Sequence, residues 1–281
     1  METTMPTRFL DVPGGRLAYD VTGEGPLVIC APSMGDLRAE YRFLAPRLVA
    51  AGYRVVVTDV RGHGESSVGW SDYSVAGVGA DMLALARALG GGPALLVGTS
   101  MAGGAAVWAA AEAPKSVAGV VLIDPFVRNG EGPLWVSRLL FGTLFAKPWG
   151  PVLWLRYYAS LYPTAKPADF ADYQRRLGAN LREPGRFTAL RQMLFASKAA
   201  SAARLGRVTV PALVVMGTKD RDFKDPAGEA RRVAAELRGT HATVQLIEGA
   251  GHYPHAEMPG QTATAIVPFL NGVRVGVAHG A

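Results

Sequence analysis

Cysteine is nearly absent from this 281-residue chain, which contains only Cys30. A single cysteine excludes an internal disulfide and is typical of a reducing compartment. The N-terminus has no basic segment followed by an apolar stretch, so it does not resemble a signal peptide. The most apolar region, residues 133–158, is interrupted by Arg138, Lys147 and Arg156 and is too broken to span a membrane. We therefore expect a soluble cytoplasmic protein.

Blocks of like charge are also missing, although the formal net charge is +6. Arginine and lysine are scattered along the chain, whereas a surface that binds nucleic acid normally shows a clustered stripe. No nucleic-acid partner is expected, and a small molecule remains as the substrate. Hydrophobic residues make up 49% of the chain and charged residues 19%, so the chain can bury a substantial core. Nothing in the sequence indicates the oligomeric state.

Short β-branched runs alternate with longer Ala/Leu-rich segments in most of the chain. The runs predict strands at residues 16–21, 27–30, 54–59, 94–97, 117–123, 211–217 and 243–247. The segments between them predict helices at residues 40–51, 74–89, 102–113, 228–237 and 261–270, and residues 272–281 read as a frayed tail. This order implies right-handed crossovers and an α/β fold, in which helices flank a mostly parallel central sheet. Residues 126–205 interrupt the pattern with helical periodicity alone, which indicates inserted helices.

A serine between a buried strand and a helix is the strongest chemical signal. Ser100 follows the apolar run Ala94–Val97 and precedes a helix of small residues, with Gly98, Ala102 and Gly103 around it. A serine on such a sharp turn is held in a strained conformation with its hydroxyl projecting from the sheet. The following helix also offers free N–H groups at its start, where negative charge is stabilised. Two other Gly-x-Ser triplets, ending at Ser66 and Ser71, lack this context. Ser100 is therefore the predicted nucleophile.

A serine hydroxyl needs a base, and histidine is the usual choice near neutral pH. Of the five histidines, His252 follows two glycines in the loop between the last strand and the last helix, where open parallel sheets place their chemistry. His255, in the same loop, is expected to face solvent or to cap the next helix. His63, His241 and His279 lie in less favourable positions. We therefore expect His252 to be the base.

An acid should orient the imidazole and stabilise its protonated form. Asp220 lies just beyond the strand that precedes His252, and Ser100, Asp220 and His252 then follow the order nucleophile, acid, histidine. Two alternatives stay open. Asp222 would be the acid if the loop were longer, although it reads as a surface or turn residue, and Asp124 follows the preceding strand.

Four segments, taken together, make the chain similar to the α/β-hydrolase superfamily. They are Leu27–Tyr41, Asp59–Ser66, Gly98–Gly103, and Gly217–Asp220 with Gly251 and His252. The resemblance implies a hydrolase core of residues 1–125 and 206–281 and a helical cap, or lid, of residues 126–205. It also implies that His63 is structural. A serine at position 100 argues against the epoxide hydrolases and dehalogenases of this fold, which use aspartate there.

The resemblance also implies an oxyanion hole made of the N–H after the nucleophile, that of Met101, and an N–H of the loop after the third strand. In that loop Ala31 and Pro32 replace the usual His-Gly, and Pro32 has no N–H. The second donor is assigned to Ser33, with Met34 as the alternative.

The expected activity is ester hydrolysis through an acyl-enzyme, which requires no metal and no organic cofactor. Aromatic residues of the cap would line a mostly apolar pocket, which favours a hydrophobic ester. The same fold also hosts carbon–carbon bond hydrolases, lactonases and cofactor-free perhydrolases or oxygenases, and a signal-binding receptor could retain the triad.

Overall fold

A mostly parallel sheet forms the centre of the computed structural model, which describes residues 6–130, 134–146 and 148–279. Within these residues eight strands pair in the order β1-β2-β4-β3-β5-β6-β7-β8. The strands are β1 (Arg8–Val12), β2 (Gly15–Thr22), β3 (Leu27–Ala31), β4 (Arg54–Thr58), β5 (Ala94–Thr99), β6 (Val117–Ile123), β7 (Ala212–Gly217) and β8 (Ala242–Ile247). β2 is antiparallel to both of its neighbours, and every other pair is parallel.

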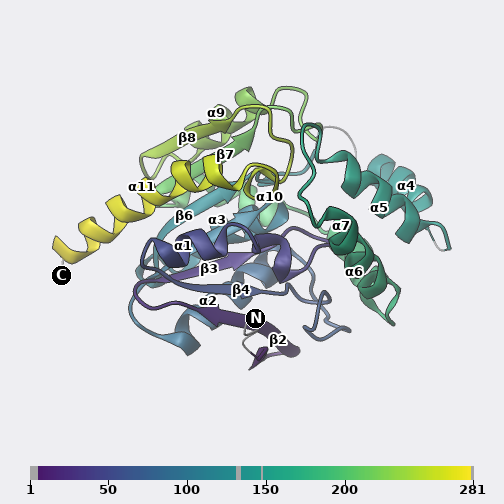
Figure 1. Ribbon diagram of the computed structural model, residues 1–281, viewed down its shortest axis with the longest axis horizontal. Helices are drawn as coiled ribbons and strands as arrows, with labels where there is room; N and C mark the ends of the chain where they lie inside the picture. The colour runs from purple at the N-terminus through teal and green to yellow at the C-terminus, as the bar shows by residue number, and fades with distance from the viewer. Residues whose placement is uncertain (1–5, 131–133, 147, 280–281) are drawn as a thin grey trace.

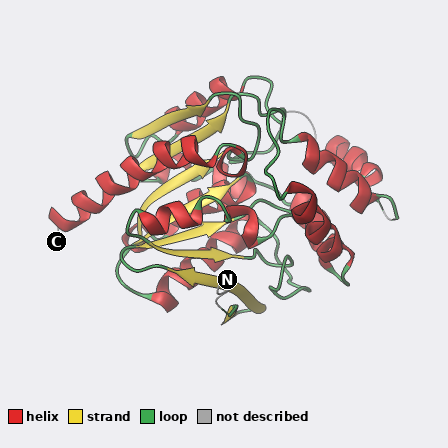
Figure 2. Cartoon of the chain, in the orientation of Figure 1, coloured by secondary structure: helices red, strands yellow, loops and turns green. Residues whose placement is uncertain are grey.

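Helices cover both faces of the sheet, because its central strands are apolar on both sides. One face packs against α1 (Ala45–Ala50) and α11 (Pro259–His279), and the other against α2 (Val75–Leu89), α3 (Met101–Glu112) and α9 (Pro226–Glu236). Figure 2 shows this layering, with strands in yellow between red helices. Short helical turns link the layers at η1 (Arg38–Tyr41), η2 (Pro114–Ser116), η3 (Leu205–Arg207) and α10 (Pro254–Glu257). No helix in the described ranges combines the length and the apolar character needed to cross a membrane.

A separate group of helices lies between β6 and β7 in sequence. They are α4 (Leu134–Leu144), α5 (Gly150–Ser160), α6 (Phe170–Arg182), α7 (Arg186–Phe195) and α8 (Ala199–Ala202). Figure 1 shows α4 to α7 to the right of the sheet, beyond the ends of its parallel strands. A cluster of buried side chains, including Tyr158, Tyr173 and Phe187, packs α5, α6 and α7 together and onto Leu37 and Tyr253.

Every strand predicted from the sequence is present, so the predicted α/β fold is confirmed. Ser74 begins α2, as predicted, and its hydroxyl accepts a 3.2 Å hydrogen bond from the Gly77 N–H. Strand β1 was not predicted, because its sequence RFLDV lacks an alternating or β-branched pattern. Residues 40–51 form η1 and α1 rather than one helix, and α11 continues to His279, well into the tail that was expected to be frayed.

The carboxyl ends of the six parallel strands, β3 to β8, meet at one edge of the sheet. In the parallel register Gly98 pairs with Leu122, and Ile123 pairs with Val215, so the residues that follow β5, β6 and β7 are neighbours. Gly217 pairs with Ile247 at the end of β8. Ser100, Asp124, Asp220 and His252 all lie just beyond this edge, which faces the inserted helices (Figure 1).

Candidate active site

Ser100 lies on the sharp turn between β5 and α3. Its φ of 56° and ψ of −120° are a strained combination for a residue with a side chain, and such strain costs about 1–3 kcal/mol. Hydrogen bonds hold the turn in place, because the Ser100 N–H donates to Ile123 O at 2.8 Å and its carbonyl accepts from the Phe126 N–H at 2.9 Å. A Cβ at Gly98 would lie 2.2 Å from the Ala102 carbonyl oxygen, so this position requires glycine. The predicted strand–turn–helix context is therefore present.

His252 and Asp220 form the central polar contact of the site. The distance from His252 Nδ1 to Asp220 Oδ2 is 2.6 Å, and only 2% of His252 and 1% of Asp220 is exposed. The loop of His252 is anchored by its own N–H, which donates to Leu161 O at 3.1 Å. Gly251 allows this approach, because a Cβ there would lie 2.2 Å from the same carbonyl oxygen. The structure thus joins two of the three predicted residues directly.

The electrostatics of this pair favour an ionised acid beside the imidazole. Burial opposes protonation of the imidazole, but the Asp220 carboxylate outweighs it and raises the pKa of His252. Burial likewise disfavours the Asp220 carboxylate, yet His252 and the Asp222 N–H, 2.9 Å from Asp220 Oδ1, lower the pKa of Asp220. Asp220 is therefore the negative group that faces the imidazole.

Asp124 takes the opposite protonation state. It is fully buried with a φ of 43°, and its Oδ1 accepts a 3.0 Å hydrogen bond from the Gly217 N–H. Burial, together with the nearby Asp220 charge, raises the pKa of Asp124 well above its usual range. Two carboxyl groups this close cannot both ionise easily, and these opposite pKa shifts favour the proton on Asp124 and the charge on Asp220.

Asp222 lies in the turn after β7, as expected, and it is partly buried. Its Oδ2 accepts a 2.6 Å hydrogen bond from the Tyr157 hydroxyl and lies 3.8 Å from His252 Nδ1. The shorter contact of His252 is to Asp220, and burial raises the pKa of Asp222. Asp222 therefore connects the inserted helix α5 to the loop after β7.

Phe126 contacts both Ser100 and His252. The Phe126 N–H is bonded to the Ser100 carbonyl, and its ring centroid lies 5.6 Å from that of His252. In the described part of the chain, however, the Ser100 hydroxyl and the His252 imidazole are not hydrogen-bonded to each other. Such contacts are often long in an enzyme without substrate and tighten when substrate binds.

The loop after β3 contains the two candidates for the second oxyanion donor. The Ser33 N–H donates to Glu40 Oε2 at 2.8 Å, and the Ser33 hydroxyl donates to the same oxygen at 2.8 Å. The Ser33 N–H, expected to face the oxyanion, is thus already used. By contrast, neither the Met34 N–H nor the Met101 N–H donates to any acceptor within the described residues.

His255 corrects a prediction. It is fully buried rather than facing solvent, and its Nε2 lies 2.9 Å from Glu40 Oε1 while its ring stacks on Tyr41 at 4.9 Å. His63 is also buried, and its Nε2 accepts from the Gly35 N–H at 3.0 Å, which fits a structural role. His241 is exposed, and the side chain of His279 lies outside those described.

One group of residues has the spacing of metal ligands. Asp124, Asp220 and His252 each place a potential ligand atom within 4.8 Å of the others. The 2.6 Å hydrogen bond already pairs His252 Nδ1 with Asp220 Oδ2. This bond favours a role in which His252 and Asp220 share a proton over one in which both bind the same metal ion.

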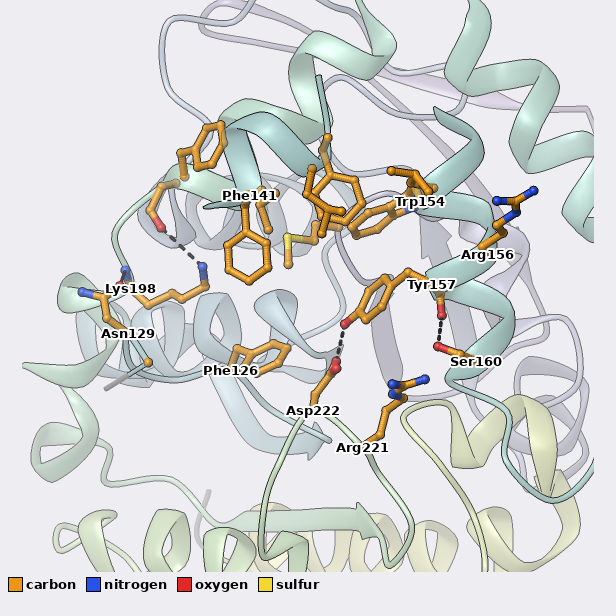
Figure 3. A pocket seen from close by; sticks show the side chains of 18 of the residues that line it. Phe126, Asn129, Phe141, Trp154, Arg156, Tyr157, Ser160, Lys198, Arg221 and Asp222 are labelled. Atoms are coloured by element: carbon orange, nitrogen blue, oxygen red, sulfur yellow. Dashed lines mark hydrogen bonds between the residues drawn. The ribbon is translucent and has the colours of Figure 1, made fainter. Parts of the chain in front are cut away.

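A cavity of about 810 Å³ adjoins these groups. Met34, Phe126 and Asp222 line its wall on the sheet side, and Ser100 and His252 are not among the residues that line it. The inserted helices supply most of the rest, chiefly the apolar side chains of Phe141, Leu144, Phe145, Leu153, Trp154, Leu194 and Phe195. Figure 3 shows Phe126, Phe141, Trp154 and Tyr157 around this space.

Comparison with known proteins identifies the family. A family model described as alpha/beta hydrolase fold matches residues 26–259. The chain belongs to the α/β-hydrolase family. It is 26% identical to epoxide hydrolase A of Mycobacterium tuberculosis over 95% of this chain and 98% of that protein. It is 28% identical to 2-(acetamidomethylene)succinate hydrolase of Mesorhizobium japonicum, over 92% of this chain and 93% of that protein.

The solved structures agree on the fold. The enol-lactonase of Burkholderia xenovorans superposes with a TM-score of 0.76 over 94% of this chain and all of that chain, at 23% identity. The two relatives named above, from Mycobacterium tuberculosis and Mesorhizobium japonicum, are both hydrolases.

Sequence reasoning missed two polar groups of the site. Glu40 lies within a segment predicted as an ordinary helix, and nothing in its spacing indicated that it would bond the Ser33 loop. Lys198 also went unnoticed, although it lines the cavity. A lysine in a stretch of alanine and serine carries no signal until the fold places it.

Proposed function

We propose that this α/β-hydrolase hydrolyses carboxylic esters through an acyl-enzyme, with Ser100 as nucleophile, His252 as base and Asp220 as the acid that orients it. The observation that carries the proposal is the 2.6 Å bond between Asp220 and His252 beside the strained Ser100 turn. The charged Asp220 holds the imidazole with Nδ1 toward it, so Nε2 is free to take the proton of the Ser100 hydroxyl.

The oxyanion of the tetrahedral intermediate would be stabilised by the N–H groups of Met101 and Met34. Met101 begins α3, where the helix dipole favours negative charge. We assign the second donor to Met34 rather than Ser33, because the Ser33 N–H is bonded to Glu40. A preorganised pair of donors of this kind contributes about 3 kcal/mol per donor to transition-state stabilisation.

The apolar cavity supports a hydrophobic substrate, bound between the sheet edge and the inserted helices. We assign residues 126–205 as a cap and residues 1–125 with 206–281 as the core that carries the chemistry. Ser100 stands where the epoxide hydrolases of this fold use aspartate, and a serine favours acyl transfer to water. Lactonase activity would use the same acyl-enzyme, so esters and lactones are both substrates to test.

The decisive experiment combines active-site labelling with turnover. The wild-type protein should react with a fluorophosphonate probe and hydrolyse p-nitrophenyl acetate, whereas Ser100→Ala should lose both activities, with kcat reduced about 10⁴-fold or more. Ser71→Ala is the matched control, because Ser71 lies in another Gly-x-Ser triplet and is exposed. Retention of more than a few per cent of the rate by Ser100→Ala would refute the assignment.

A further inference from the structure

The positively charged side chains that line the cavity differ in whether an acid or water compensates their charge. Arg128 lies between two acids and forms ion pairs with Glu229 and Glu236. Arg156 and Arg221 are exposed, so water solvates their charge. Lys198 is half-buried and forms no ion pair with any residue of the described ranges. Lys198 is therefore the cation of this cavity that is partly removed from water and is not paired with a carboxylate of the described residues.

The position of Lys198 is fixed by its backbone. Its N–H donates to Asn129 Oδ1 at 2.8 Å, which ties the start of α8 to the loop after β6. The side chain then extends into the cavity beside Phe141, as Figure 3 shows. Its Nζ donates one long bond of 3.4 Å, to the carbonyl of Ala196.

An ammonium in this position is poorly satisfied. It carries three donors, of which one makes a long bond to a neutral carbonyl. Burial lowers the pKa of Lys198, and among the residues that the structure describes no neighbouring carboxylate offsets the loss of hydration. A carboxylate that entered the cavity would accept a charge-assisted hydrogen bond and restore the lost solvation.

We propose that Lys198 binds a free carboxylate on the substrate, so that the preferred ester is an amphiphile with an apolar body and one negative charge remote from the bond that is cleaved. This inference rests on the proposed ester hydrolysis for its kinetic test but not for its binding test. One lysine with a single spare charge matches a monoanion. A phosphate dianion would leave a second charge unpaired among the phenylalanines of the cavity.

Binding is measured first, because it needs no turnover. By isothermal titration calorimetry, the wild-type protein should bind 4-phenylbutyrate about tenfold or more tightly than the neutral 4-phenylbutyramide. Lys198→Met keeps the length of the side chain and should bind both compounds equally, whereas Lys198→Arg should retain the preference. Lys115→Met is the matched control, because it removes an exposed charge in η2, at the opposite end of β6.

A kinetic series then measures the reach of the site. Mono-p-nitrophenyl esters of succinate, glutarate, adipate and suberate are each compared with a neutral p-nitrophenyl ester of equal chain length. Since Lys198 and Ser100 are both fixed, the carboxylate should improve kcat/KM most at one chain length. That advantage should disappear in Lys198→Met, whose kcat/KM for the neutral esters should stay within about threefold of the wild type.

The two tests separate this inference from the proposed function. If no ester is hydrolysed but the carboxylate still binds through Lys198, ester hydrolysis is refuted and the anion site stands. If the wild type does not prefer the carboxylate, or if Lys198→Met keeps the preference, the anion site is refuted. A preference lost in Arg221→Met instead would also refute it, because a different cation would then be the anchor.

Discussion

Two buried imidazole–carboxylate pairs lie on either side of Tyr253, and they differ in what surrounds them. His252 bonds Asp220 through Nδ1, and within the described part of the chain its Nε2 makes no hydrogen bond. His255 bonds Glu40 through Nε2, and its buried Nδ1 has no hydrogen-bond partner among the residues that the structure describes. The remaining bonds of the carboxylates differ too, since Asp220 accepts from the Asp222 N–H and Glu40 accepts from Ser33.

The different surroundings of the two pairs show that an imidazole and a carboxylate can serve either to transfer a proton or to fix the position of a loop. The His252 pair leaves one imidazole nitrogen available at the sheet edge, next to Phe126 and the cavity. Both pairs are almost completely buried, so burial does not separate them, but the carboxylate of the His255 pair fixes the backbone of the loop after β3 through the Ser33 N–H. We therefore assign catalysis to the first pair and positioning of the Met34 N–H to the second.

The largest effect that would distinguish the pairs is expected from Asp220→Asn. The amide would favour the wrong imidazole tautomer and remove the charge that stabilises the imidazolium, so kcat/KM for p-nitrophenyl acetate should fall about 10⁴-fold. Asp124→Asn is the matched control, because Asp124 is neutral and bonds the Gly217 N–H. If it costs as much activity as Asp220→Asn, the assignment of the acid is wrong.

The pH dependence of the reaction should reflect the same pair. His252 acts as a base only when it is neutral, and Asp220 raises its pKa above the ordinary value near 6.5. Activity should therefore decline, as the pH falls, at a pH above 6.5, and Asp220→Asn should move the midpoint of that decline about one unit or more toward acid. Profiles of kcat/KM from about pH 5 to about pH 9 provide the measurement. An unchanged midpoint would contradict the assignment of Asp220.

Compared with Asp220→Asn, Glu40→Gln is expected to lose less activity but more stability. The carboxylate accepts bonds from the Ser33 N–H, the Ser33 hydroxyl and His255, and an amide cannot accept from all three equally well. Unfolding in urea should show a free energy of unfolding lowered by about 3 kcal/mol, because a buried carboxylate that accepts three hydrogen bonds is replaced by an amide.

The kinetic parameters of Glu40→Gln give the second readout. The value of kcat should fall more than KM rises, since the Met34 N–H would act mainly on the transition state. An Asp220→Asn variant that loses as much stability as Glu40→Gln would remove the distinction between the two pairs.

The sequence was informative where local patterns determine the structure. Strand β6 matches its prediction at both ends, and Ser74 and Gly98 lie where turn and cap chemistry requires them. The loops after β5, β7 and β8 were predictable as neighbours, because parallel strands bring their carboxyl ends to one edge.

Contacts between distant segments were not predictable. Glu40 and His255 are 215 residues apart, and their pairing depends on how η1 packs against α10. For the same reason His255 was expected at the surface, and the donation of the Ser33 N–H to Glu40 could not be foreseen. The periodicity of a sequence predicts which face of a helix or strand a side chain lies on, but it does not predict which residue of another element that side chain contacts.

The smallest effect is expected from Ser33→Ala, which tests whether the second pair acts through the backbone. The substitution removes the hydroxyl that bonds Glu40 Oε2 and Tyr253, while the backbone N–H can still donate to Glu40. Stability should fall by about 1 kcal/mol for the lost hydrogen bonds, and kcat should change by less than about threefold. Urea unfolding and p-nitrophenyl acetate hydrolysis measure both. Removal of an oxyanion donor is expected to lower kcat about 100-fold. A loss of that size in Ser33→Ala would show that the Ser33 hydroxyl itself faces the reacting carbonyl. The loop after β3 would then take part in the chemistry instead of only positioning the Met34 N–H.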